Sequence, residues 1–143
     1  MEKGNRIVVD TGVLVSAFVF GGTPREAVRK AVQESIIILS PFVLEEYREV
    51  PLLLEKKKKI NHLQFKALIA GISAFVSESV IVYPKAKLDL CRDKKDNMLL
   101  ECCQEAKAEF LVTGDKDLLE MKDLPFLLSI VTPASYIRRS MKS

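Results

Sequence analysis

Two aspartates follow apolar runs at points where a carboxylate could bind a metal ion or activate water. Asp10 comes directly after Ile7–Val9, and Asp115 comes shortly after Phe110–Val112. Short apolar runs of this kind are typical of strands buried in a parallel sheet. Because parallel strands end at one edge of the sheet, where such folds bind ligands, we expect both carboxylates to lie along that edge.

Two further acids lie on the apolar side of predicted helices. At 100° per residue, Glu46 falls within the arc that Phe42 and Val50 help to define. Asp96 is in line with Leu100, four residues further on, near the start of its own helix. Both carboxylates are therefore expected to face inward, where an ionised group loses hydration unless a cation or hydrogen-bond donors compensate it.

The sequence offers no conspicuous internal cation for these acids. His62 is the only histidine, and the basic residues gather at Lys56–Lys59 and at the C-terminus. A divalent metal is the natural partner, and an all-oxygen ligand set favours Mg²⁺ or Mn²⁺ over zinc.

Each acid taken singly also allows a structural interpretation. Asp10 could simply end a strand, Asp96 could favour a helix N-terminus, and Asp115 could form an Asx turn with Asp117. Glu46 has no such role, because a mid-helix carboxylate on an apolar arc stabilises nothing by itself. The joint pattern is what favours a functional site.

Strand and helix signals alternate along the chain and predict an α/β fold, a three-layer α/β/α sandwich around a mainly parallel sheet. The strand signals are Ile7–Val9, Ile36–Leu39, Val80–Tyr83, Phe110–Val112 and Ser129–Val131. Helices are expected from Val13, over Thr23–Glu34, from Pro41 with a kink or break at Pro51, over Asn61–Val76, from about Asp93, and after Thr132-Pro133.

Length and composition fit one domain spanning residues 1–143. The 143 residues are 48% apolar and 29% charged, which disfavours disorder, and a net charge of +3 permits nucleic-acid binding without demanding it. No apolar run approaches the roughly 18 residues that span a bilayer, so we expect a cytoplasmic protein with no membrane partner. The spacing of Cys91, Cys102 and Cys103 fits buried apolar residues better than a disulfide framework.

Five segments, in order along nearly the whole chain, resemble the PIN-domain family of metal-dependent nucleases. The most specific of them is Thr113-Gly114-Asp115-Lys116-Asp117 followed by two leucines. The matching segments are Ile7–Thr11, Leu44–Val50 after Ser40, Asp93–Asn97, Phe110–Leu119 and Ile130–Pro133. Within the family, the chain is most similar to the toxin components of bacterial and archaeal toxin–antitoxin pairs.

The resemblance implies a five-stranded parallel sheet with a metal site at its carboxyl edge. The residues that match the family's catalytic and metal-binding acids are Asp10, Glu46, Asp96 and Asp115, with Asp117 as an accessory metal ligand. Thr113 is expected to orient a ligand or water. Glu45 or Glu49 could replace Glu46, and Asp93 could replace Asp96, although the helical arc disfavours Glu45.

The activity that the resemblance implies is a Mg²⁺/Mn²⁺-dependent endoribonuclease that hydrolyses RNA phosphodiester bonds by metal-activated water. Its implied partners are an RNA substrate, a cognate antitoxin and a second copy of the chain. The alternative is a catalytically weak PIN domain that acts as an RNA-binding or protein-interaction module. An aspartyl phosphatase ranks well below both, because no second aspartate stands two residues after Asp10.

Basic and aromatic residues could assist RNA binding. Tyr47 and Tyr136 could stack on bases, although core packing is the stronger expectation for both. The candidate phosphate contacts are Arg25, Arg29, Lys30, Lys56–Lys59, Arg138, Arg139 and Lys142.

Overall fold

Five parallel strands form one sheet in the order β3-β2-β1-β4-β5. They are β1 (Asn5–Val9), β2 (Ser35–Leu39), β3 (Ser79–Ile81), β4 (Phe110–Val112) and β5 (Ser129–Val131). The computed structural model describes residues 4–139, and Lys142 lies outside them. The chain starts at the centre of the sheet and reverses its direction of growth between β1 and β4. Such a switch point is where open parallel sheets bind ligands.

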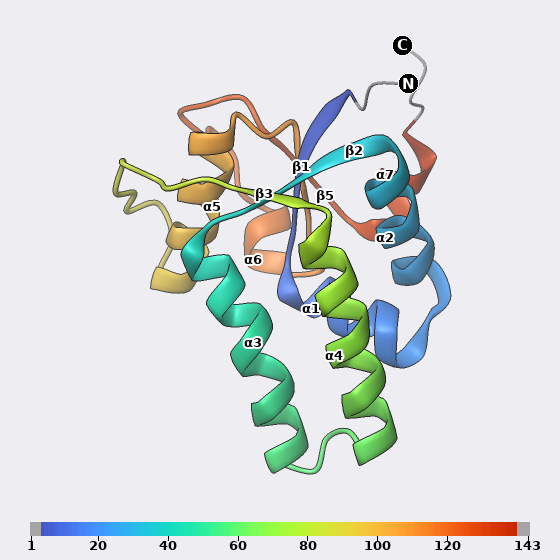
Figure 1. Cartoon of the computed structure of the whole chain (residues 1–143). Coiled ribbons are helices and arrows are strands. Elements are labelled where there is room, and N and C mark those ends of the chain that lie inside the picture. The colour runs from blue at the N-terminus through green and yellow to red at the C-terminus, as the bar shows by residue number, and fades with distance from the viewer. Residues whose placement is uncertain (1–3, 140–143) are drawn as a thin grey trace.

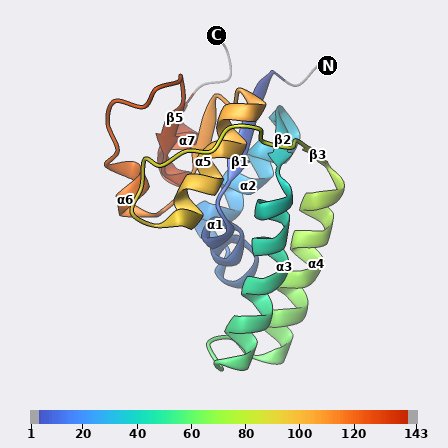
Figure 2. The ribbon, with the colours of Figure 1, turned by 90° about the vertical axis from the view of Figure 1, so that its left-hand side faces the viewer.

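Helices cover both faces of the sheet, as the sequence predicted. α5 (Lys94–Ala106) lies on one side, while α2 (Gly22–Glu34) and α7 (Pro133–Arg138) lie on the other (Figure 1). α3 (Pro41–Lys56) and α4 (His62–Ser77) form a helical hairpin that projects away from the sheet (Figures 1 and 2). Two short helical segments follow the central strands: α1 (Thr11–Val15) with the π-helical turn η1 (Ser16–Phe20), and α6 (Lys116–Leu119). Within residues 4–139, none of the helices has the length and apolar character to traverse a lipid bilayer.

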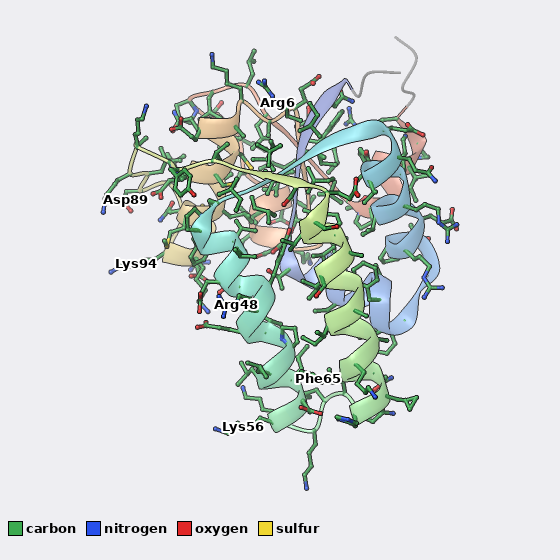
Figure 3. All side chains as sticks on the ribbon, in the orientation of Figure 1. Arg6, Arg48, Lys56, Phe65, Asp89 and Lys94 are labelled. Atoms are coloured by element: carbon green, nitrogen blue, oxygen red, sulfur yellow. The ribbon has the colours of Figure 1, made fainter. Side chains whose placement is uncertain are left out.

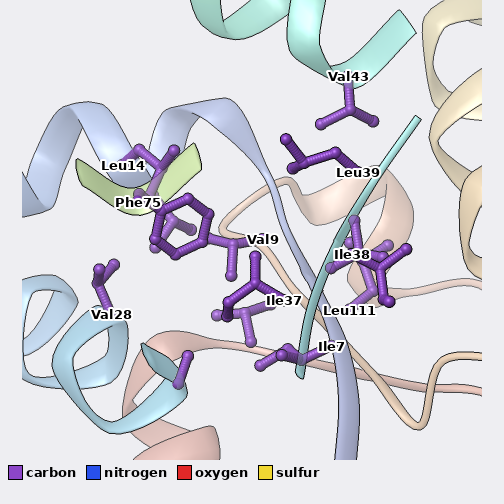
Figure 4. Packing of buried hydrophobic residues seen from close by; sticks show 14 of the residues in the cluster. Ile7, Val9, Leu14, Val28, Ile37, Ile38, Leu39, Val43, Phe75 and Leu111 are labelled. Atoms are coloured by element: carbon purple, nitrogen blue, oxygen red, sulfur yellow. The ribbon is translucent and has the colours of Figure 1, made fainter. Parts of the chain in front are cut away.

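The central strands supply the core on both faces of the sheet. Ile7, Ile37, Leu39 and Leu111 are fully buried and pack with side chains from the surrounding helices (Figure 4). This double burial explains why Ile36–Leu39 shows no alternation of polar and apolar residues. The core therefore holds β1 and β4 rigidly at the switch point.

The sequence predicted a kink or a break at Pro51, and the helix is not broken there. α3 continues through it to Lys56, although proline cannot donate the usual hydrogen bond to the carbonyl of Tyr47. Tyr47 is buried, its hydroxyl donates to the carbonyl of Val9, and α3 packs against α4. This tertiary packing offsets the lost bond.

Three boundaries also differ from the prediction. α1 begins at Thr11 instead of Val13, and α2 begins at Gly22 instead of Thr23, because Gly21 with φ +81° serves as the N-cap. β3 ends at Ile81 instead of Tyr83, although the Val82 amide still donates to the Leu39 carbonyl at 2.8 Å.

Candidate functional site

Asp10 and Thr113 meet at the switch point between β1 and β4. The buried Thr113 hydroxyl donates to Asp10 Oδ2 at 2.7 Å and accepts from the Asp115 backbone amide at 3.0 Å. The Asp10 amide in turn donates to the Val112 carbonyl at 2.9 Å and so extends the pairing of the two strands. One threonine side chain thus fixes both the Asp10 carboxylate and the turn that carries Asp115.

Asp115 caps the short helix α6. Its Oδ1 accepts from the Asp117 amide at 2.9 Å, which is the Asx turn expected from the sequence. Asp115 is half-buried, whereas Asp117 is exposed. The structural and functional interpretations of Asp115 are therefore compatible, because the turn uses only one carboxylate oxygen.

Asp96 lies in the first turn of α5, where neighbouring side chains hold the chain in place. The buried Asn97 accepts from the Leu90 and Cys91 amides, both at 2.8 Å, and donates to the Cys91 carbonyl. Asp93 is the exposed N-cap of α5 and accepts from the Lys95 amide at 2.9 Å. Asp96 is the less exposed of the two aspartates, and the Asp93 carboxylate already caps the helix. Asp96 is therefore the better candidate ligand of the two.

Glu46 lies on α3 beside Tyr47, whose hydroxyl ties the helix to the end of β1. The Glu46 side chain is only 22% exposed, whereas Glu45 and Glu49 are exposed. Contrary to the expectation that no cation is at hand, Lys95 Nζ lies 3.6 Å from Glu46 Oε2. The lysine side chain is 69% exposed, so this ion pair is weak.

The acids share one electrostatic environment. Burial raises the pKa of Asp10, the Thr113 hydrogen bond opposes the rise, and the charges of Asp115 and Glu46 add to it. Burial, followed by the charges of Asp115, Asp93 and Asp10, raises the pKa of Asp96 to about 6. A positive charge placed beside them would therefore favour the ionised form of both carboxyl groups.

Their side chains do not form a closed coordination set. Across residues 4–139, no three Asp, Glu, His or Cys side chains converge tightly enough to hold a metal ion in their present rotamers. The donor set nevertheless fits Mg²⁺ or Mn²⁺, because all the nearby donors are carboxylate oxygens whose mutual repulsion a cation would relieve. Asp10, Asp96 and Asp115 interact with one another, Glu46 interacts with Asp10, and Asp117 lies at the margin beside Asp96.

Sequence reasoning missed the contacts that position these acids. Lys95 adjoins Asp96 in the sequence, but its pairing with Glu46 depends on how α3 and α5 pack. Asn97 stands next to Asp96 in a helix, and only the path of residues 82–93 shows why it is buried. A polar residue on the apolar side of a predicted helix was the available signal for Asn97.

One predicted phosphate contact has a structural role instead, and the expected core packing of two tyrosines is confirmed. Lys30 Nζ donates to the carbonyls of Tyr136, Ile137 and Arg139, so it caps α7 and was wrongly predicted to bind phosphate. Tyr47 and Tyr136 are both buried in the core.

Comparison with known proteins places the chain in one family. Residues 6–117 match the family model described as PIN domain, a segment that includes every acid discussed above. The chain is 32% identical over 126 residues to the uncharacterized protein MJ1680 of Methanocaldococcus jannaschii, covering 86% of this chain and 79% of that protein.

A solved structure shares the fold. It is a chain from the crystal structure of VapBC2 from Rickettsia felis bound to a DNA fragment from its promoter. The TM-score is 0.58 and the sequence identity is 16%, and the match covers 87% of this chain and 98% of that one. The family match over most of the chain and this shared fold lead to one conclusion. The chain belongs to the PIN-domain family, whose members are generally nucleases.

Proposed function

We propose that this PIN domain is a Mg²⁺- or Mn²⁺-dependent endoribonuclease that hydrolyses RNA phosphodiester bonds. The observation that carries the proposal is the group of like charges at the β1/β4 switch point. Asp10, Asp96 and Asp115 come from three separate segments; after burial, the charge of Asp115 raises the pKa of both Asp10 and Asp96, and the charge of Asp10 adds to the rise at Asp96. A fold under selection for stability alone would not retain such an arrangement, whereas a metal site requires it.

The residues divide into those that hold the metal and those that orient them. Asp10 and Asp115 would bind it most directly, with Glu46 and Asp96 binding directly or through ordered water and Asp117 as an accessory ligand. A bound Mg²⁺ or Mn²⁺ neutralises phosphate charge and lowers the pKa of water. Thr113 orients the Asp10 carboxylate through its 2.7 Å hydrogen bond, and Tyr47 anchors the helix that carries Glu46.

The biological setting that we propose is a toxin–antitoxin pair, in which this chain is the toxin and acts as a homodimer. The sequence resemblance to such toxins supports this role. The fold shared with a chain of VapBC2, which was solved on promoter DNA, supports it further.

The test is cleavage of RNA by the purified protein with Mn²⁺ or Mg²⁺. Asp115→Asn should lower the rate by more than about 100-fold while the fold survives, and EDTA should stop the wild-type reaction. Glu45→Gln is the matched control, since this exposed carboxylate lies one residue from Glu46, and it should keep nearly the full rate. RNA binding without cleavage at any Mn²⁺ or Mg²⁺ concentration would favour the alternative, an RNA-binding module.

A further inference from the structure

A pocket lies where the start of α3 and one side of α5 meet the segment that precedes α5. The two helices pack together, and the Glu46–Lys95 ion pair at 3.6 Å bridges them. Phe42 lies one turn before Glu46 on α3, and Met98 lies one turn after Lys95 on α5. Phe42 and Met98 line this pocket of about 290 Å³, so one edge of it is about one helical turn from Glu46.

The outer wall of this pocket is an extended segment, residues 82–92, which we call the strap. It crosses α5 on the way from β3 to Asp93 (Figure 2), and Asp89 lies near its outer tip (Figure 3). Backbone amides of the strap donate to α5 side chains: Lys85 to Glu105 at 3.2 Å and Leu88 to Glu101 at 2.8 Å. These hydrogen bonds hold the strap against α5, and each uses one carboxylate oxygen of a glutamate.

The strap presents an aromatic ring and two cations to solvent. Tyr83 is 68% exposed, and Lys85 and Lys87 are exposed at alternate positions after it. All three line the pocket. An exposed ring with flanking lysines is the combination on which single-stranded nucleic acids stack while their phosphates are neutralised.

A second, separate pocket of about 360 Å³ lies along α3, where Lys56 and Lys95 line it together with Glu46 and Glu49. Lysines therefore line both pockets: Lys85 and Lys87 the first, Lys56 and Lys95 the second. Charge of this distribution suits a polyanionic strand that passes the acidic cluster.

We propose that the strap pocket is a binding subsite for an unpaired nucleotide of single-stranded RNA. Tyr83 stacks on the base, and Lys85 and Lys87 contact the flanking phosphates. The inference rests on the proposed function and extends it, because it assigns a substrate class and substrate-binding residues outside the acidic cluster. An acidic peptide could use the lysines but would not need the exposed Tyr83 ring beside them, so RNA is favoured.

The test measures binding of an unstructured, fluorescein-labelled RNA of about 12 nucleotides to the full-length protein in EDTA, by fluorescence anisotropy. EDTA prevents turnover, so this binding does not depend on nuclease activity. Tyr83→Ala should weaken binding about tenfold, and Tyr83→Phe, which keeps the ring, should bind like wild type. Lys85→Gln/Lys87→Gln should make the plot of log K against log salt shallower by about 1.4, the value for two phosphate contacts on a single strand.

The matched control removes two exposed lysines elsewhere, Lys66→Gln/Lys107→Gln, and should leave the salt slope unchanged. Equal effects of the two double variants, full affinity in Tyr83→Ala, or no binding of RNA by the wild type would each overturn the subsite. If the strap variants lose RNA affinity but the wild type cleaves no RNA with Mn²⁺, the subsite stands and the nuclease proposal fails.

Discussion

The polar groups at the two ends of the sheet lie in different environments: those at the amino end have hydrogen-bond partners within the fold, whereas the acids at the carboxyl end lie near like charges. At the amino end, the Lys30 ammonium meets three backbone carbonyls and lies 5.0 Å from the ring centroid of Tyr136. The Tyr136 hydroxyl is in turn 3.1 Å from the Ser35 hydroxyl. At the carboxyl end, burial and then neighbouring like charges raise the pKa values of Asp10 and Asp96. The charged group at the first end is satisfied by the fold itself, whereas the carboxylates at the second would gain from an added cation.

The largest expected effect at the amino end is on stability. Lys30→Met should lower the free energy of unfolding by about 2 kcal/mol, because the last carbonyls of α7 lose a charged donor. Urea denaturation measures the loss, with Lys66→Met on an exposed surface as the control, expected within about 0.5 kcal/mol of wild type. If both variants lose the same amount, the capping role of Lys30 is wrong.

At the carboxyl end, the corresponding change should affect activity more than stability. Thr113→Val keeps the shape of the buried side chain but removes the hydroxyl that orients Asp10 and accepts from the Asp115 amide. We expect RNA cleavage to fall about tenfold, and Thr113→Ser to retain most of the rate. Unchanged cleavage by Thr113→Val would show that this hydrogen bond does not organise the site.

A smaller effect is expected at Asp96, where removing the charge should stabilise the fold, whereas most substitutions destabilise it. Asp96→Asn should raise the free energy of unfolding by about 1 kcal/mol at pH 7 in EDTA, an effect limited by solvent screening of a half-buried group. The folded protein binds the Asp96 proton more tightly than the unfolded chain does. The stability that the protonated Asp96 carboxyl contributes is therefore lost as pH rises from about 4 to about 6 and stays lost above that.

Chemical denaturation at pH 7 and at pH 4 separates this electrostatic gain from a packing effect. The advantage of Asp96→Asn should shrink at pH 4, where the wild-type carboxyl is mostly protonated when folded. An equal difference at both pH values would contradict the repulsion between the acids.

The sequence predicted the positions of the strands better than the tertiary contacts that hold the helices and the acidic side chains in place. Unbroken apolar runs such as Ile36–Leu39 are unambiguous because both faces of the sheet are buried, and the caps at Asn61 and Thr132 are local signals. The sequence could not show that the helix continues through Pro51, because the burial of Tyr47, which holds α3 in place, depends on distant contacts. The pairing of Lys95 with Glu46 was missed for the same reason.

The acids themselves could be predicted as a group because sheet topology alone brings the ends of β1 and β4 together. The distances between their carboxylates could not be predicted, since these depend on side-chain rotamers and on how closely α3 and α5 approach each other. The sequence therefore indicated which side chains to expect at this edge, but not that, within residues 4–139, no three of them converge tightly enough to hold a metal ion.

Thermal unfolding of the wild type with Mn²⁺ and with EDTA tests most directly whether the acidic cluster binds a divalent cation. We expect Mn²⁺ at about 100 times its Kd to raise the melting temperature by roughly 5–10 °C, and Asp10→Asn to lose most of that rise. No rise in the wild type, or an equal rise in Asp10→Asn, would contradict the account.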